Sequence, residues 1–117
     1  MSGKLSTHIL DNYHGRPASG VDIELYRDNG DAYSPIGRFQ TNQEGRTDAL
    51  LLDKDSLLTG SYRLVFKVGP YFRREEVELP KPSFLENVSI DVNLQAGESY
   101  HVPLLCTPWS YSTYRGS

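Results

Sequence analysis

The chain has 117 residues, of which 38% are hydrophobic and 23% charged, and its formal net charge is -3. These values predict one soluble domain over residues 1–117 with a single core. The net negative charge gives no electrostatic reason to expect a nucleic acid or an anionic membrane as a partner. No apolar stretch approaches the roughly 20 residues of a membrane span, and no secretory signal precedes the first strand, so we expect a cytoplasmic protein. Cys106 is the sole cysteine, which excludes an intrachain disulfide.

Alternation of apolar and polar residues predicts three strands in the first half of the chain. Residues 5–10 place Leu5 and Ile9 on one face and His8 on the other. Residues 21–26 show the clearest alternation, and residues 36–41 form a further strand after an Asn-Gly turn. The sequence therefore predicts strands joined by short turns in this half.

One short helix is predicted, over residues 53–58. Asp53 can cap its first turn, and Gly60 can end it. No other segment supports a helix, because the remaining apolar residues follow a period of two.

The second half of the chain continues the strand pattern. Residues 62–68 form a strand that Gly69-Pro70 ends, residues 88–94 alternate again, and residues 100–106 form the last strand, with His101 on its outer face. Residues 71–87 carry a run of charges and two prolines, which is typical of a solvated edge. About seven such segments separated by turns predict an all-β fold, an antiparallel β-sandwich of two sheets.

His8 and His101 are the candidate functional residues of the pattern. Each lies on the outer face of its strand, where it is either a surface histidine without a role or part of a site. Histidine titrates near neutrality and suits a general base, and an arginine offers a charged fork of donors to an oxygen anion. Two histidines and an arginine on one surface would suit an anionic ligand rich in heteroatoms, although the sequence alone does not bring them together.

Other chemistries have weaker support. The chain has no Gly-x-Ser-x-Gly elbow, no P-loop and no dinucleotide fingerprint. Its histidines, at positions 8, 14 and 101, lack the spacing that metal sites often show, so we expect neither a required metal nor a cofactor.

The last seven residues contain two tyrosines, an arginine and three hydroxyl side chains. Chain ends are usually frayed, but disordered tails seldom carry aromatic residues at this density. The composition of residues 111–117 therefore favours an ordered tail.

Four motifs in order along the chain resemble the 5-hydroxyisourate hydrolases, the transthyretin-related proteins. They are Leu-Ser-Thr-His-Ile-Leu-Asp at 5–11 with Gly-Arg-Pro-Ala at 15–18, Asn-Gln-Glu-Gly-Arg-Thr-Asp at 42–48, His-Val-Pro-Leu-Leu at 101–105, and Tyr-Arg-Gly-Ser at 114–117. Any one of them would be weak, but together they span nearly the whole chain.

The resemblance implies a transthyretin-like fold, with its short helix at residues 53–58, and hydrolysis of 5-hydroxyisourate to 2-oxo-4-hydroxy-4-carboxy-5-ureidoimidazoline. The positions implied in catalysis are His8, Arg46, His101 and Ser117, the last acting alone or with its terminal carboxylate. Substrate binding is implied for His8, Arg46 and Tyr114. The division of roles between the two histidines stays open.

The resemblance also implies a homotetramer whose sites lie at subunit interfaces and bind a small purine-derived substrate. An alternative is a transthyretin-like carrier of small molecules without catalysis, and a more distant one is an interaction module without a ligand. Residues 73–87 depart from the aromatic-rich segment common in the family, and Cys106 and Trp109 stand where other residues are expected.

Overall fold

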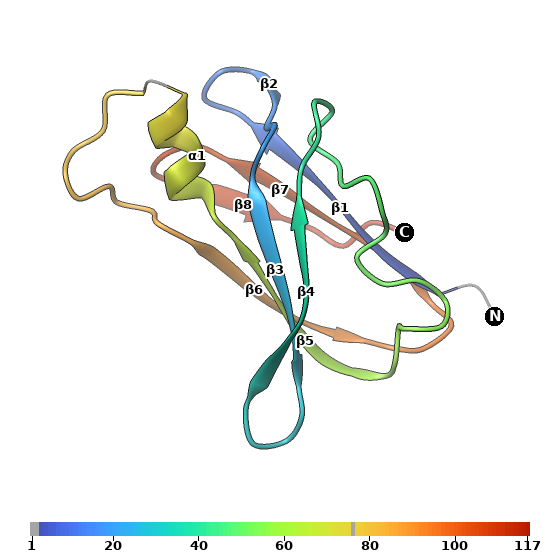
Figure 1. Ribbon diagram of the computed structural model, residues 1–117. Helices are drawn as coiled ribbons and strands as arrows, with labels where there is room; N and C mark the ends of the chain where they lie inside the picture. The colour runs from blue at the N-terminus through green and yellow to red at the C-terminus, as the bar shows by residue number, and fades with distance from the viewer. Residues whose placement is uncertain (1–2, 76) are drawn as a thin grey trace.

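The computed structural model describes residues 3–75 and 77–117, which form two stacked four-stranded sheets (Figure 1). The strand order is β2-β1-β7-β8 in the first sheet and β4-β3-β5-β6 in the second. The elements are β1 (Lys4–Asp11), β2 (Arg16–Pro17), β3 (Asp22–Asp28), β4 (Tyr33–Gln40), β5 (Gly60–Phe66), α1 (Val68–Arg74), β6 (Val88–Leu94), β7 (Ser99–Cys106) and β8 (Tyr111–Thr113). The predicted all-β sandwich with one short helix is confirmed.

The pairing of β1 with β7 departs from the predicted antiparallel arrangement, because these two strands run parallel. The other pairs of named strands in residues 3–75 and 77–117 are antiparallel. In the parallel pair, Ser6 lies opposite His101, and His8 lies opposite Pro103. The first sheet therefore brings the two ends of the sequence side by side.

Every second side chain along the strands points into the space between the two sheets, and these side chains form the core. The apolar side chains that point inward from β3, β5, β6 and β7 are buried. The exceptions are Ile90, Val92 and Tyr100, which are partly buried. The fully buried members with the largest side chains include Leu5, Ile9, Ile23, Leu25, Tyr62, Leu64, Phe66 and Leu104. Cys106 is also buried, and burial raises the pKa of its thiol to about 12. Because the inner faces are mostly apolar, Ser6 and His8 of β1 and His101 of β7 are left on the outer face of the first sheet.

The helix is not where the sequence predicted it, and the prediction for residues 53–58 is wrong. Asp53 does act as a cap, since its carboxylate accepts hydrogen bonds from the N–H groups of Asp55 and Ser56, but the chain makes only turns there. A helix of one or two turns is unstable unless it packs a face against the core.

The helix instead forms at α1, directly after β5. Pro70 lies in its first turn, where a backbone N–H has no partner within the helix, so the proline costs little. Val68, Tyr71 and Phe72 bury one side of α1 against the core, and the hydroxyl of Tyr71 donates to the buried carboxylate of Asp11 at 2.7 Å. Tertiary packing therefore outweighs the Gly-Pro signal that we read as a break.

The tail is ordered, as predicted. Residues 111–113 form β8 on the edge of the first sheet, paired with β7. Further along, Gly116 forms an isolated bridge with His101. The tail therefore follows β7 back along the sheet toward the histidine.

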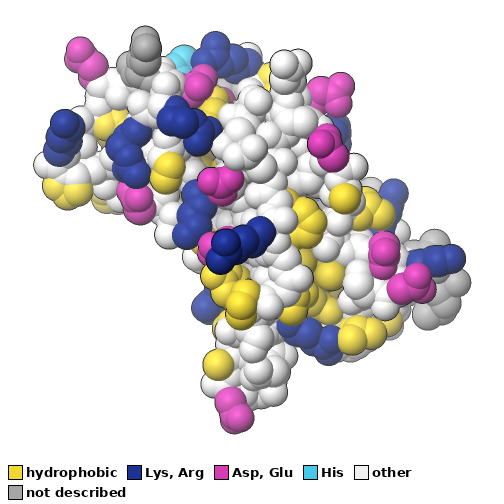
Figure 2. All heavy atoms as spheres, viewed as in Figure 1, with side chains coloured by type: hydrophobic (Ala, Val, Ile, Leu, Met, Phe, Trp, Pro, Cys, Tyr) yellow, Lys and Arg dark blue, Asp and Glu magenta, His cyan; other side chains and the backbone are white. Residues whose placement is uncertain are grey.

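The surface carries charges of both signs. Figure 2 shows Lys and Arg side chains interspersed with Asp and Glu over the viewed face. In the described part of the chain, no helix combines the length and hydropathy needed to cross a membrane. The cytoplasmic location and the single-domain assignment stay predictions.

Candidate functional site

The outer face of β1 carries Ser6 and His8. On this strand Leu5, Thr7 and Ile9 are buried, so the residues between them face outward and are half-buried. Buried Thr7 also bonds across the sheet, since its hydroxyl donates to the carbonyl of Val102 at 2.7 Å. The buried side chains of β1 thus fix which of its residues face outward, and His8 faces outward as predicted.

A tight turn at residues 42–46 lies against the exposed edge of β1 near His8. The side-chain oxygen of Asn42 accepts the N–H groups of Glu44 at 2.9 Å and of Arg46 at 3.2 Å, while the Asn42 N–H donates to the Arg46 carbonyl at 2.7 Å. These bonds define the backbone at both ends of the turn. The position of Arg46 therefore follows from its own turn, although its side chain is exposed.

Gly45 makes the contact between this turn and β1. The N–H of Ile9 donates to the Gly45 carbonyl at 2.8 Å. A Cβ on Gly45 would collide with the carbonyl oxygen of Ile9 and would also approach the ring of His8 to 3.3 Å. Glycine is required here, because its φ of 77° is also disfavoured for other residues.

The turn also holds the ring of His8. His8 Nε2 lies 2.8 Å from the main-chain oxygen of Glu44. A carbonyl oxygen only accepts, so Nε2 carries a proton. This leaves Nδ1 as the nitrogen available to a ligand.

His101 lies on the neighbouring strand, diagonal to His8 on the same face. With strands about 4.8 Å apart and a rise of about 3.3 Å per residue, this register separates the two Cα atoms by about 8 Å. The ring of His101 is held from β1, because its Nδ1 lies 2.9 Å from the hydroxyl of Ser6. The fold thus brings together two histidines that are 93 positions apart in the sequence.

Burial is the largest cause that lowers the pKa of His101 below its ordinary value of 6.5, followed by the positive charges of Arg46, His8 and Lys4. A cation near the ring disfavours the imidazolium form. His101 is therefore neutral near pH 7 and can accept a proton, as a general base must.

The tail reaches the site through Gly116. The N–H and C=O groups of Gly116 and His101 bond to each other, which places Gly116 directly beside the histidine in the sheet and Ser117 one residue further along. Ser117 is exposed. Of the five predicted site residues, His8 and His101 therefore share one face, the turn that carries Arg46 holds the His8 ring, and Ser117 follows the residue that bridges to His101.

Tyr114, the fifth predicted site residue, lies at a groove between the two sheets. It is 61% exposed and lines a groove of about 360 Å³ between the two sheets, with Val92 of β6, Tyr100 of β7 and Arg115. Arg115 packs over the Tyr100 ring at 4.5 Å. The predicted role of Tyr114 in substrate binding therefore stays a prediction.

Sequence reasoning missed two groups that contact the histidines, Ser6 and the main-chain carbonyl of Glu44. Ser6 had a signal, because it precedes His8 by two residues and so shares its face. The Glu44 carbonyl had none, since a backbone oxygen carries no mark in the sequence.

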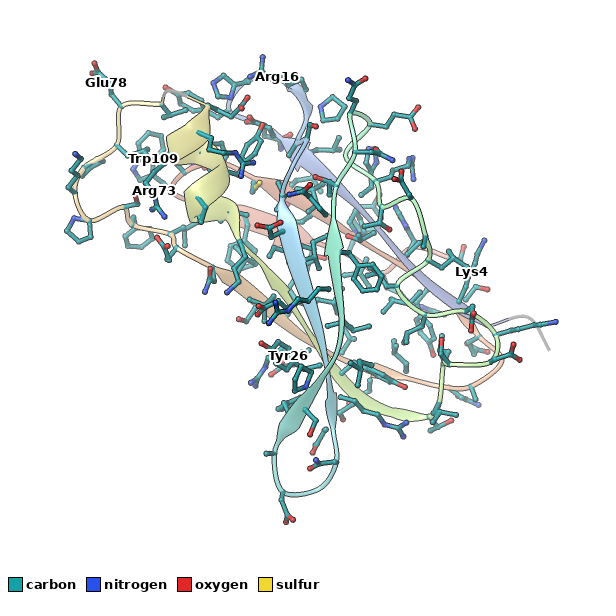
Figure 3. All side chains as sticks on the ribbon, in the orientation of Figure 1. Lys4, Arg16, Tyr26, Arg73, Glu78 and Trp109 are labelled. Carbon is teal, nitrogen blue, oxygen red and sulfur yellow. The ribbon has the colours of Figure 1, made fainter. Side chains whose placement is uncertain are left out.

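The face could bind an anion and accept a proton, but it lacks the ligands of a metal centre. Within residues 3–75 and 77–117, no three His, Cys, Asp or Glu residues are grouped to hold a metal ion. His14 lies outside the site, with Nδ1 bound to the carboxylate of Asp11 at 2.6 Å. Figure 3 shows Lys4 at the start of β1 and Arg16 of β2 at its opposite end, which marks the two limits of the face.

Comparison with known proteins identifies the family. Residues 5–116 match the model of the HIUase/Transthyretin family. The chain is similar to 5-hydroxyisourate hydrolase 2 of Rhizobium meliloti (strain 1021), with 50% identity over 99% of this chain and 98% of the relative.

Two solved structures are similar in fold. The structure of the Klebsiella pneumoniae 5-hydroxyisourate hydrolase has a TM-score of 0.78 and 33% identity, over 98% of this chain and 99% of that one. Sea bream transthyretin in complex with thyroxine has a TM-score of 0.86 and 23% identity, over 97% of this chain and 94% of that one, a likeness of fold alone. The chain belongs to the HIUase/Transthyretin family.

Proposed function

We propose that this protein hydrolyses 5-hydroxyisourate to 2-oxo-4-hydroxy-4-carboxy-5-ureidoimidazoline. The observation that carries the proposal is the convergence of His8, the Arg46 turn, His101 and the end of the tail on one face of the first sheet. The full-length similarity to 5-hydroxyisourate hydrolase 2 of Rhizobium meliloti supports the same substrate.

The proposed roles follow from the charge and the hydrogen bonds of each group. His101, neutral near pH 7 because its pKa is lowered, removes a proton from the water that attacks a ring carbonyl. His8 orients that water or the substrate through its free ring nitrogen. Arg46 pairs with the anionic substrate and stabilises the negative charge that develops on oxygen. Ser117, beside His101, completes a polar relay.

In balanced terms, the water oxygen bonds to the ring carbon and the ring C–N bond breaks. The proton taken by His101 passes to the departing ring nitrogen. No oxidant or reductant is needed, which fits a site built from two histidines and an arginine.

A homotetramer is part of the proposal, because the face is open in a single chain. Arg46 and Ser117 are exposed, and catalysis benefits when water is partly excluded. Trp109, Tyr111 and Tyr114 are each about half exposed or more, which is apolar surface suited to an interface. In such an assembly the exposed Tyr114 would bind substrate in a site shared between neighbouring subunits. A monomer by light scattering would contradict this assembly.

The carrier alternative has only the fold in its favour. Sea bream transthyretin in complex with thyroxine has the same sandwich fold at 23% identity. A likeness at this level of identity does not indicate which ligand this chain binds. A carrier also has no need of a neutral histidine held next to an arginine.

The test follows the ultraviolet absorbance of freshly generated 5-hydroxyisourate with and without the protein. The wild type should accelerate the decay, and His101→Asn should lose roughly 10²- to 10⁴-fold in kcat/KM, the usual contribution of a general base. His14→Asn is the matched control and should keep the activity, because His14 bonds to Asp11 away from the face. A folded tetramer that leaves the decay unchanged would rule out the hydrolase.

A further inference from the structure

We propose that Ser6 and the main-chain carbonyl of Glu44 are positioning groups that turn a proton-accepting nitrogen of each histidine toward the substrate. His8 then accepts through Nδ1 and His101 through Nε2, because the other nitrogen of each ring is already engaged. This inference rests on the proposed hydrolase function and specifies how the two histidines share it.

The assignment of His8 follows from its partner. Since the Glu44 carbonyl can only accept, the proton of a neutral His8 ring resides on Nε2, and the lone pair resides on Nδ1. Among the described residues, His8 Nδ1 has no hydrogen-bond partner. A neutral His8 therefore offers an acceptor to the site and no donor.

The Glu44 carbonyl is itself aimed by the turn. Asn42 accepts the N–H groups of Glu44 and Arg46, and Gly45 fits closely against Ile9. The same turn that carries Arg46 thus sets the tautomer of His8. One rigid element couples the charged group and the first acceptor.

The hydrogen-bond partner of His101 can act as a donor or as an acceptor. The Ser6 hydroxyl, 2.9 Å from Nδ1, can donate or accept. Burial, followed by nearby positive charges, lowers the pKa of His101 and favours the neutral ring. Of the two neutral forms, only the one that donates from Nδ1 to Ser6 leaves the lone pair of Nε2 for a base in the site, so Nδ1 is assigned the proton. His101 Nε2 has no partner among the described residues and is left as the base.

Two acceptors on one face define how a water molecule can bind between them. A water has two hydrogens to donate, and it can direct them to His8 Nδ1 and His101 Nε2. Its oxygen lone pair then remains free to attack a carbonyl whose oxygen bonds to Arg46. If either ring adopted the other tautomer, the water would lose one of the two acceptors for its protons and would instead accept a hydrogen bond on one of its two lone pairs.

The tautomers can be measured without substrate. Nitrogen-15 NMR at about pH 8, above the ordinary pKa of histidine, separates protonated from acceptor ring nitrogens. In the wild type, His8 should be protonated at Nε2 and His101 at Nδ1. In Ser6→Ala, His101 should become a mixture, and Ser6→Thr should restore the single form because it restores the hydroxyl. Ser89→Ala, an exposed serine on β6 of the other sheet, is the matched control and should change nothing.

Kinetics provide the second readout. Ser6→Ala should lower kcat by roughly tenfold with little change in KM, the size expected for one lost hydrogen bond, and Ser6→Thr should recover it. A His101 protonated at Nε2 in the wild type would overturn the proposal, and so would a Ser6→Ala variant with the wild-type tautomer and kcat. Absence of hydrolysis by the wild type would instead remove the proposed function, while the spectra would still decide whether Ser6 and Glu44 fix the two rings.

Discussion

Gly116 and His101 exchange two backbone hydrogen bonds, one from the Gly116 N–H at 2.7 Å and one from the His101 N–H at 3.1 Å. A Cβ on Gly116 would lie 3.1 Å from the Cβ of His101, which is tighter than ordinary contact. The tail therefore lies flat against the histidine only because this residue has no side chain.

Gly116→Val should displace the tail or the His101 ring and lower kcat/KM by roughly tenfold or more, since small misplacement of a catalytic group is costly. The melting temperature should change little, because the tail is at the edge of the sheet. Ser112→Val, on exposed β8, is the control and should retain activity. Wild-type kinetics in a folded Gly116→Val protein would contradict a role for this contact.

The pH dependence of kcat/KM should follow the protonation of the His101 ring. Because its pKa is lowered from 6.5, the residue stays neutral as the pH falls below that value, so the acid limb of the profile should have its midpoint below 6.5. Lys4→Gln removes one of the charges that disfavour the imidazolium, so the limb should move to higher pH while activity at pH near 8 is kept. A limb that stays in place or moves to lower pH would contradict this electrostatic coupling.

Gly45 and Gly15 form a natural pair for a stability test, because both have positive φ, 77° and 75°. A Cβ on Gly15 would meet nothing within 4 Å, whereas one on Gly45 would strike the carbonyl of Ile9. Gly15→Ala should cost only about 1 kcal/mol, the strain of the backbone conformation. Gly45→Ala should cost at least about 3 kcal/mol and should also lose activity, since it moves the turn that holds His8 and Arg46. Urea unfolding measures both, and equal losses would show that the close contact is unimportant.

Asp11 is a buried carboxylate that ties the end of β1 to α1. It accepts bonds from the Tyr13 and His14 N–H groups, from the His14 ring and from the Tyr71 hydroxyl. Burial alone would raise the pKa of Asp11, but the bonds from His14 and Tyr71 outweigh it and lower the pKa. Asp11→Ala should therefore reduce the free energy of unfolding by roughly 2–4 kcal/mol, because it leaves buried donors without a partner.

The lowered pKa also sets a pH dependence for stability. The contribution of Asp11 is complete above the carboxyl's ordinary pKa of 3.8 and is lost as the pH falls through the lower folded value. The wild type should thus lose stability in acid more steeply than Asp11→Ala. Asp91→Asn, which removes an exposed ion pair with Arg63, should cost less than about 1 kcal/mol and serves as the control. Equal effects of the two substitutions would mean that burial of Asp11 carries no weight.

The sequence predicted the strands well because strand formation is local. The period-two pattern of apolar residues in β3, β5 and β6 indicates which side chains face the core, because burial of the apolar face stabilises that orientation of the strand. The same alternation directed His8 and His101 outward, as the structure has them. The helix prediction was wrong for the opposite reason. The cap at Asp53 and the stop at Gly60 are local signals, whereas the packing of Tyr71 and Phe72 that stabilises α1 is not local.

By itself, the sequence determined the two-sheet sandwich, the outward direction of the histidines and the order of the motifs that mark the family. Only the tertiary structure decided that β1 and β7 run parallel side by side, that Ser6 and Glu44 engage the histidine rings, and that Gly116 pairs with His101. The physical reason is range. Which face a side chain takes depends on its immediate neighbours, whereas contact between residues about a hundred positions apart depends on how the sheets pair and pack after the whole chain has folded.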